Sequence, residues 1–211
     1  SKELQLTLTG KSCGAEERAP MCGIPYHAAE TYLTRLVKKG YKVAICEQVE
    51  DPKLAKGMVK REVTRVVTPG TTLNAQALDE TKNNYIMCIA YIGDHYGISS
   101  ADITTGDYYV TEVDSERKLL DEVNKYQPTE IICNEAFYIS GIDIDDMKNR
   151  MGIVIYSLDA WYFSDETAQM TLKDHFKVRD LEGLGLADYD SGVVAAGALL
   201  KSLYETQKKT L

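Results

Sequence analysis

The stretch from Ala19 to Pro52, APMCGIPYHAAETYLTRLVKKGYKVAICEQVEDP, combines a helix, a helix stop and a strand in one continuous unit. Apolar residues recur at helical spacing and form a single stripe: Ala29, Tyr32, Leu33, Leu36 and Val37. Gly40 follows where a left-handed helix cap is favoured. Val43–Cys46 is apolar on both alternating sides, which predicts a largely buried strand. The pattern therefore predicts a small α/β unit.

The composition is typical of a globular protein. The chain has 211 residues, of which 44% are hydrophobic and 27% charged, enough for a substantial core and for two domains or one large domain. No window approaches the roughly 18 unbroken apolar residues of a membrane helix, and no signal peptide opens the sequence. We therefore predict a cytoplasmic protein without a membrane partner.

The cysteines favour the same compartment. There are 5, an odd number, and none form a C-x-x-C pair, so free thiols in a reducing environment are expected. Cys46, Cys88 and Cys133 lie in apolar, strand-like runs. We predict that these three thiols are buried.

The charge is distributed unevenly along the chain. Residues 1–75 carry 12 Lys and Arg against 8 Asp and Glu, a net charge of +4, whereas residues 76–211 carry 12 against 24, a net charge of −12. Between them, Pro69–Asn84 has no strong hydrophobic period and is rich in turn-forming residues. The sequence thus predicts two domains, residues 1–75 and residues 76–211, with different partners.

The elements outside the opening stretch complete the expected α/β fold. In the first region, strands are predicted at Leu4–Thr9 and Val59–Thr68, the latter with Val63, Arg65 and Val67 on alternate positions. In the second region, an antiparallel meander is predicted at Tyr85–Ile92, Tyr96–Ile103 and Tyr108–Val113. Strands at Glu130–Cys133 and Ile153–Tyr156 then alternate with helices at Ser115–Tyr126, near Met147–Met151, after Ser164 and after Asp190. We expect a mixed sheet flanked by helices.

Two of these helices carry more detailed predictions. Ser164 is expected to cap the helix that follows it, whose inner face would present Ala168, Leu172 and Phe176. Asp190 and Ser191 are expected to cap the last helix. The first half of that helix is apolar all round, so it is expected to be buried.

Five stretches of the chain resemble the bacterial MutS family of DNA mismatch repair proteins. The similarity begins in PMCGIPYHAAETYLTRLVKKGYKVAICEQVEDP (Pro20–Pro52) and continues in KREVTRVVTPGT (Lys60–Thr71). It extends through ADITTGDYYVTEV (Ala101–Val113), RDLEGLGL (Arg179–Leu186) and ETQKKTL (Glu205–Leu211). These stretches follow the order of the family and cover almost the whole chain.

The resemblance implies the C-terminal part of a mismatch-recognition domain, truncated at its N-terminus, followed by a complete connector domain of ribonuclease H-like topology. It further implies a non-catalytic role, in which the first domain supports contact with mismatched double-stranded DNA and the second transmits signals and docks MutL. The parent protein would be a homodimer whose ATP and Mg site lies in a downstream domain. No cofactor is therefore expected in this chain.

Candidate DNA-binding residues all lie in the basic first region. Duplex binding requires Lys and Arg placed against phosphates, together with groups that reach the minor groove. The candidates are Lys11, Met21, Lys60, Arg61 and Arg65. The resemblance favours Lys11 and Arg61, because the matching positions lie in DNA-proximal loops of the family; each of the other cations could equally be a solvated surface charge.

The family's Phe-x-Glu tripeptide, whose Phe wedges beside the mispaired base, does not occur in this sequence. The chain has 3 Phe residues, Phe137, Phe163 and Phe176, and none is followed two positions later by Glu. In the family the tripeptide precedes the stretch with which this chain opens. We therefore expect a truncated domain without the mismatch-reading group.

Two alternatives remain open at this point. A ribonuclease H-like fold could support a two-metal nuclease, but that chemistry needs an acidic residue on the central strand, and Tyr85–Ile92 has none. The histidines also lack metal-ligand spacing, so we predict neither catalytic nor metal-binding residues. The other alternative is a MutS paralogue that does not act in repair.

Overall fold

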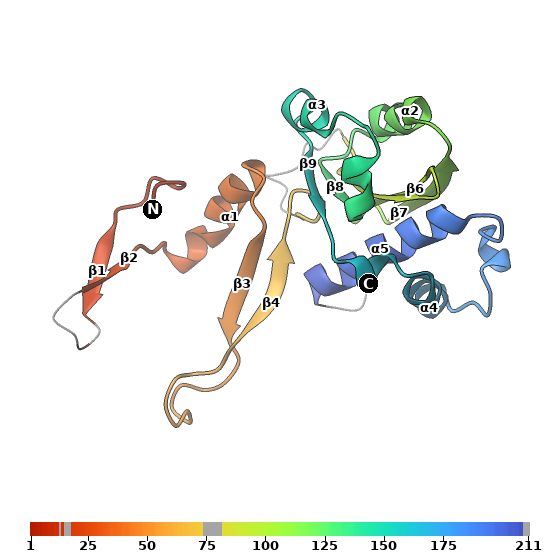
Figure 1. The fold of residues 1–211 in the computed structure, drawn as a ribbon. Helices are drawn as coiled ribbons and strands as arrows, with labels where there is room; N and C mark the ends of the chain where they lie inside the picture. The colour runs from red at the N-terminus through yellow and green to blue at the C-terminus, as the bar shows by residue number, and fades with distance from the viewer. Residues whose placement is uncertain (13, 15–17, 74–81, 209–211) are drawn as a thin grey trace.

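The computed structural model describes residues 1–12, 14, 18–73 and 82–208 (Figure 1). We call residues 1–73 the first unit and residues 82–208 the second unit. Most of the expected linker, residues 74–81, lies outside the described residues, as do Cys13 and residues 209–211.

The second unit is built on a five-stranded sheet with the strand order β7-β6-β5-β8-β9. β5 (Ile86–Ile92), β6 (His95–Asp102) and β7 (Asp107–Val113) pair consecutively and antiparallel, which confirms the predicted meander. β8 (Glu130–Cys133) and β9 (Val154–Ser157) add in parallel on the other side of β5. β5 is therefore central, and its first five residues are buried, as its apolar sequence predicts.

Helices cover both faces of this sheet. α2 (Glu116–Tyr126) and α3 (Ile144–Asn149) lie on one face, and α5 (Asp190–Gln207) lies on the other with α4 (Asp165–Phe176) beside it (Figure 1). Phe137 is completely buried in the core on the α2 side, and the apolar first half of α5 forms the opposite core. Three 3₁₀ turns connect these elements: η2 (Glu135–Ile139), η3 (Ala160–Phe163) and η4 (Glu182–Leu184). The mixed sheet flanked by helices is confirmed.

Among its described residues, the first unit has two separate two-stranded sheets. β1 (Thr9–Ser12) pairs with β2 (Arg18–Met21), and β3 (Val43–Gln48) pairs with β4 (Arg61–Val67), both antiparallel. Between the two hairpins, η1 (Tyr26–Ala28) leads into α1 (Ala29–Lys38). Gly40 follows α1 with φ +83°, which confirms the left-handed cap. Leu33, Val37 and Val67 form the buried cluster that holds α1 against β3 and β4.

Three predictions for the first unit are wrong. The strand expected at Leu4–Thr9 begins only at Thr9, because residues 2–5 form a turn in which Gln5 takes φ +54°. β3 is not largely buried, and Ala44 and Cys46 are exposed. The physical reason is that α1 covers only one face of the β3–β4 sheet, so residues on the other face meet solvent.

Two details of the second unit also differ from expectation. Phe176 closes α4 and keeps 40% of its surface exposed, although Ala168 and Leu172 are buried and Ser164 caps the helix through Thr167 N–H. α5 begins at Asp190 rather than after a cap formed by Asp190 and Ser191. The carboxylate of Glu112 in β7 instead accepts the Gly192 N–H at 2.9 Å, so a strand distant in sequence serves the first turn of the helix.

The predictions for Cys88 and Cys133 are confirmed. Cys88 and Cys133 are free and buried, and burial raises the pKa of Cys88 well above its usual value and that of Cys133 to about 12. Both thiols are therefore protonated and structural at neutral pH.

Candidate nucleic-acid interface

The first pair of candidates lies on the β1–β2 hairpin. Lys11 stands opposite Ala19, and Met21 stands opposite Thr9. Thr9 and Lys11 are alternate residues of β1 and so point to the same face of the hairpin. Met21 pairs with Thr9 and shares that face, so Lys11 and Met21 lie on the same side of the hairpin. Met21 exposes 46% of its surface, which is notable for an apolar side chain. The Thr9 hydroxyl donates to the Met21 carbonyl at 2.8 Å and helps to hold the register.

The second group lies at the far end of the β3–β4 hairpin. Arg61 opens β4 opposite Gln48 and is exposed, and Lys60 immediately precedes it. The Lys60 ammonium lies 2.6 Å from a carboxylate oxygen of Glu62. That hydrogen bond and the Glu62 charge raise the pKa of Lys60 above its ordinary value. Lys60 is therefore cationic at neutral pH, and its charge is partly neutralised by Glu62.

Arg65 is separated from this group by a bulge in the β3–β4 ladder. Ile45 pairs with Arg65, but the next residue, Cys46, pairs with Val63, so Thr64 is the extra residue. The insertion interrupts the predicted alternation of Val63, Arg65 and Val67. It turns Val63 to the solvent-exposed face of the β3–β4 sheet, while Arg65 stays on the face covered by α1. The Arg65 guanidinium lies there 3.6 Å from the Glu30 carboxylate in the first turn of α1.

The five candidates thus fall into separate places within the described part of the first unit. Lys11 and Met21 lie on one hairpin, Lys60 and Arg61 at the end of the other, and Arg65 beneath α1. Figure 1 shows the β1–β2 hairpin set apart from the β3–β4 hairpin, with α1 between them. The bulge leaves no recognisable mark in the sequence, so the separation of Arg65 from Arg61 could not be predicted.

A junction between the two units involves residues that the sequence did not single out. Glu130 in β8 accepts the Gly70 N–H at 2.8 Å and also accepts the hydroxyl proton of Tyr156 in β9. The Lys42 ammonium, just before β3, lies 2.9 Å from the centroid of the Tyr156 ring. We call Lys42, Gly70, Glu130 and Tyr156 the junction. One sign of this junction is visible in the sequence, namely that the charged residue Glu130 opens the otherwise apolar run Glu130–Cys133.

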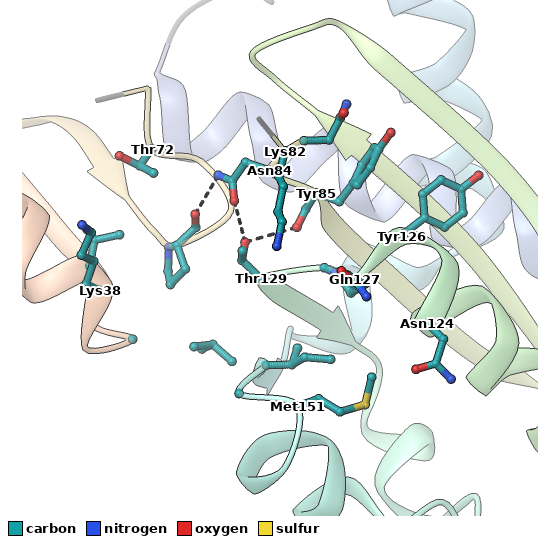
Figure 2. A pocket seen from close by; sticks show the side chains of 18 of the residues that line it. Lys38, Thr72, Lys82, Asn84, Tyr85, Asn124, Tyr126, Gln127, Thr129 and Met151 are labelled. Carbon is teal, nitrogen blue, oxygen red and sulfur yellow. Dashed lines mark hydrogen bonds between the residues drawn. The ribbon is translucent and has the colours of Figure 1, made fainter. Parts of the chain in front are cut away.

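Beside the junction, a cleft of about 880 Å³ is lined by residues from the end of α1 and from the second unit. Its side is held by Asn84, which donates to the Pro69 carbonyl at 3.0 Å and accepts from the Thr129 hydroxyl at 3.0 Å (Figure 2). The ionisable side chains among its lining residues are cations and tyrosines: Lys38, Lys82, Lys125, Arg150, Tyr85 and Tyr126. Lys125 pairs with Glu122, and Arg150 pairs with Asp146. The cleft therefore carries only modest positive charge.

Two carboxylates of the second unit, Asp102 and Asp143, accept hydrogen bonds that stabilise the fold. Asp102 at the end of β6 accepts hydrogen bonds from Asn84 N–H at 2.9 Å and Thr104 N–H at 2.8 Å. Burial raises its pKa, but these hydrogen bonds outweigh burial and hold the pKa below its ordinary value. Asp143 caps α3. Among the residues that the structure describes, no group of three His, Cys, Asp or Glu side chains could hold a metal ion.

The chain matches two family models, MutS domain I over residues 1–76 and MutS domain II over residues 84–211. The chain belongs to the MutS family. Its resemblance to that family is therefore confirmed, and the matched regions are domains I and II.

Individual relatives agree with this result. The chain is 65% identical to the DNA mismatch repair protein MutS of Lachnoclostridium phytofermentans over 211 residues, which is the whole chain and 23% of that relative. It is 50% identical to the MutS of Ruminiclostridium cellulolyticum and 45% identical to that of Acetivibrio thermocellus, in each case over the whole chain and 24% of the relative. The chain thus spans about a quarter of the length of these MutS proteins. Within the described residues, no helix combines the length and apolarity needed to span a membrane.

Proposed function

We propose that this part of a MutS protein is a non-catalytic DNA-contacting and protein-docking segment. The match to MutS domains I and II over nearly the whole chain carries the proposal. Residues 1–75 would belong to the mismatch-recognition domain, and residues 76–211 would form a connector domain of ribonuclease H-like topology. The parent protein would act in the cytoplasm as a homodimer on mismatched double-stranded DNA, with ATP and Mg bound outside this segment.

In the first unit, Lys11, Lys60 and Arg61 are proposed to contact DNA phosphates. Their exposure on the two hairpins supports this role, because phosphate contacts need accessible cations rather than a closed pocket. The exposed Met21 would lie towards the minor groove, where apolar side chains contact sugars and base edges. Arg65 would contribute less, since its guanidinium already faces Glu30.

The proposed DNA contacts can be mapped by titrating a labelled duplex into the chain and following amide resonances. We expect the largest shifts in β1–β2 and at the Lys60–Arg61 end of β3–β4. Arg61→Gln should weaken binding several-fold and reduce the salt dependence by about one phosphate contact. Lys118→Gln is the matched control, because Lys118 is an exposed lysine of the second unit paired with Asp114. Shifts confined to the second unit would contradict the proposal.

The second unit is proposed to dock MutL. Residues 76–211 carry the net negative charge, and exposed apolar side chains are available on this unit, among them Trp161, Ile139 and Met170. Such a surface favours a protein partner over a nucleic acid. Cross-linking of the chain to MutL should place the links in the second unit. Absence of cross-links from a folded sample would remove this part of the proposal.

Nuclease activity is the alternative of a different class. β5 has no acidic residue, and Asp102 is fully engaged by backbone and hydroxyl donors. We therefore propose that labelled DNA incubated with the chain and Mg²⁺ or Mn²⁺ remains intact. Metal-dependent cleavage that co-purifies with the chain would favour the nuclease instead. The relatives' names favour a repair protein over a non-repair paralogue.

A further inference from the structure

The chain leaves β4 through a turn that is buried against the second unit. Thr68, Gly70, Thr71 and Thr72 are all buried, although they follow a strand of the first unit. The Thr68 N–H donates to the Thr71 hydroxyl at 3.0 Å, and the two hydroxyl oxygens lie 2.9 Å apart. The Thr71 N–H donates back to the Thr68 carbonyl at 3.2 Å. The turn is therefore held in one conformation where it meets the second unit.

Gly70 closely approaches β5 and β8 in this turn. A Cβ atom added there would lie 2.7 Å from Ile86 Cβ and 3.0 Å from the Glu130 carboxylate. No side chain fits without moving the turn away from β5 and β8. The absence of a side chain also brings the Gly70 N–H within hydrogen-bonding distance of Glu130, at 2.8 Å.

Glu130 is completely buried, and both of its carboxylate oxygens accept hydrogen bonds. One oxygen accepts the Gly70 N–H and the other accepts the Tyr156 hydroxyl proton. A buried carboxylate is stable only where donors and a countercharge replace water. Glu130 pairs in the ladder with both Ile86 and Val154, so its position is fixed by the centre of the sheet.

Lys42 supplies the countercharge from the first unit. Its side chain is exposed overall, but its ammonium lies over the Tyr156 ring, 2.9 Å from the centroid. Burial of the ammonium lowers the pKa of Lys42, and the Glu130 charge opposes that shift. Lys42 immediately precedes β3, and Val43 pairs with Val67 at the end of β4. Both ends of the β3–β4 hairpin therefore converge on Glu130 and Tyr156.

We propose that Glu130 is a positioning residue that sets the direction in which the β3–β4 hairpin leaves the second unit. It does so by binding Gly70 directly and Lys42 through the Tyr156 ring. Arg61 lies six residues along β4 from Val67, roughly 20 Å at the usual rise of a strand. A 10° rotation at the junction would move Arg61 by about 3 Å, comparable to the length of one hydrogen bond to a phosphate. The use of this orientation in DNA binding rests on the proposed function, but the orientation itself does not.

Residual dipolar couplings of the whole chain test the proposal without DNA. In the wild type, the couplings of β3–β4 and of the five-stranded sheet should fit a single alignment. Lys42→Met should reduce the couplings of the β3–β4 hairpin relative to those of the five-stranded sheet. Lys42→Arg keeps the cation, so its hairpin couplings should stay close to those of the wild type. Gly70→Ala should act like Lys42→Met. Its matched control is Gly183→Ala, because an added Cβ at Gly183 meets nothing within 4 Å.

Amide exchange at Gly70 tests the hydrogen bond to Glu130. Glu130→Leu removes the acceptor and should accelerate exchange at Gly70 at least tenfold, whereas Glu130→Gln retains an acceptor and should keep most of the protection. The amides of Cys88 and Ile132, which pair between β5 and β8, report whether the sheet stays folded. If Glu130→Leu does not fold, the Lys42 and Gly70 variants decide the question.

Two results would overturn the proposal. One is that the hairpin couplings of Lys42→Met and Gly70→Ala are unchanged relative to the sheet. The other is that the wild-type Gly70 amide exchanges as fast as that of Gly57, in the exposed loop between β3 and β4. Arg61→Gln tests the proposed DNA contacts separately from the junction. If it weakens duplex binding while the dipolar couplings of β3–β4 stay unchanged, the result concerns the DNA contacts alone.

Discussion

The five-stranded sheet of the second unit is covered by helices on both faces, whereas each sheet of the first unit has only two strands. A two-stranded sheet is marginal by itself and needs packing against another element. The β3–β4 sheet has α1 on one side and solvent on the other, and among the described residues its buried cluster is Leu33, Val37 and Val67, with the partly buried Val43 and Ile45 packed against it. The comparison indicates that the second unit stabilises itself, while the first depends on its attachment to the second.

The largest expected effect tests this dependence. Phe137→Ala removes the largest fully buried side chain of the second unit and should lower its unfolding free energy by about 3–5 kcal/mol. Because the first unit is attached through β8 and β9, protection of β3–β4 amides should fall as well. Hydrogen exchange of both units, with denaturant unfolding, measures this.

Leu33→Ala is the reciprocal experiment in the first unit. It should reduce protection in α1 and β3–β4 and leave Ile86–Ala90 in β5 protected. If Phe137→Ala left the first unit fully protected, or if Leu33→Ala loosened β5, the proposed direction of dependence would be wrong.

A smaller effect is expected at Asp102, where the linker re-enters the second unit. Asp102→Asn weakens the acceptor for Asn84 N–H and Thr104 N–H and should destabilise the second unit by about 1–3 kcal/mol at pH 7. The folded-state pKa of Asp102 is lowered, so its ionic stabilisation is present above the unfolded value of about 3.9 and is lost as pH falls through the folded value. The difference between variant and wild type should therefore shrink below about pH 4 in urea unfolding. A constant difference would show that ionisation of Asp102 does not contribute.

The smallest effect concerns His175, on the α4–α5 side of the second unit. Burial and the charge of Lys177 lower its pKa, and its Nδ1 lies 2.6 Å from the Tyr204 hydroxyl. Because the unfolded state binds the proton more readily, stability should be complete above about pH 6.5 and fall as pH decreases through the folded value. His175→Gln should flatten this slope for the second unit between pH 7.5 and 5.5. An unchanged slope would assign the pH dependence to other groups.

The parts of the fold that the sequence predicted are those encoded locally. The meander from β5 to β7 follows from apolar runs separated by short turns, and the cap at Gly40 follows from a glycine after a helical stripe. The buried first half of α5 follows from its apolar composition. In each case, the residues that determine the element lie within it or beside it.

The parts that escaped prediction depend on contacts between distant residues. Glu112 serves the first turn of α5 across 80 positions, and Gly70 binds Glu130 across 60. The exposed face of β3 escaped for a related reason, since an apolar strand does not reveal how many of its faces are covered. Of the candidate DNA contacts, the basic character of the first unit could be predicted, but the bulge at Thr64 that separates Arg65 from Arg61 could not.

Binding of homoduplex and G·T heteroduplex DNA, compared by fluorescence anisotropy at two salt concentrations, tests the central claim most directly. The cations of the first unit are proposed to contact phosphates, which carry no mismatch information. The chain has no Phe-x-Glu tripeptide to supply an aromatic wedge, a group worth roughly 1–3 kcal/mol per stacked base. We predict weak binding that fades as salt rises and is equal for the two duplexes. A heteroduplex preference above about tenfold, roughly 1.4 kcal/mol, would show that other residues read the mismatch and would contradict this account.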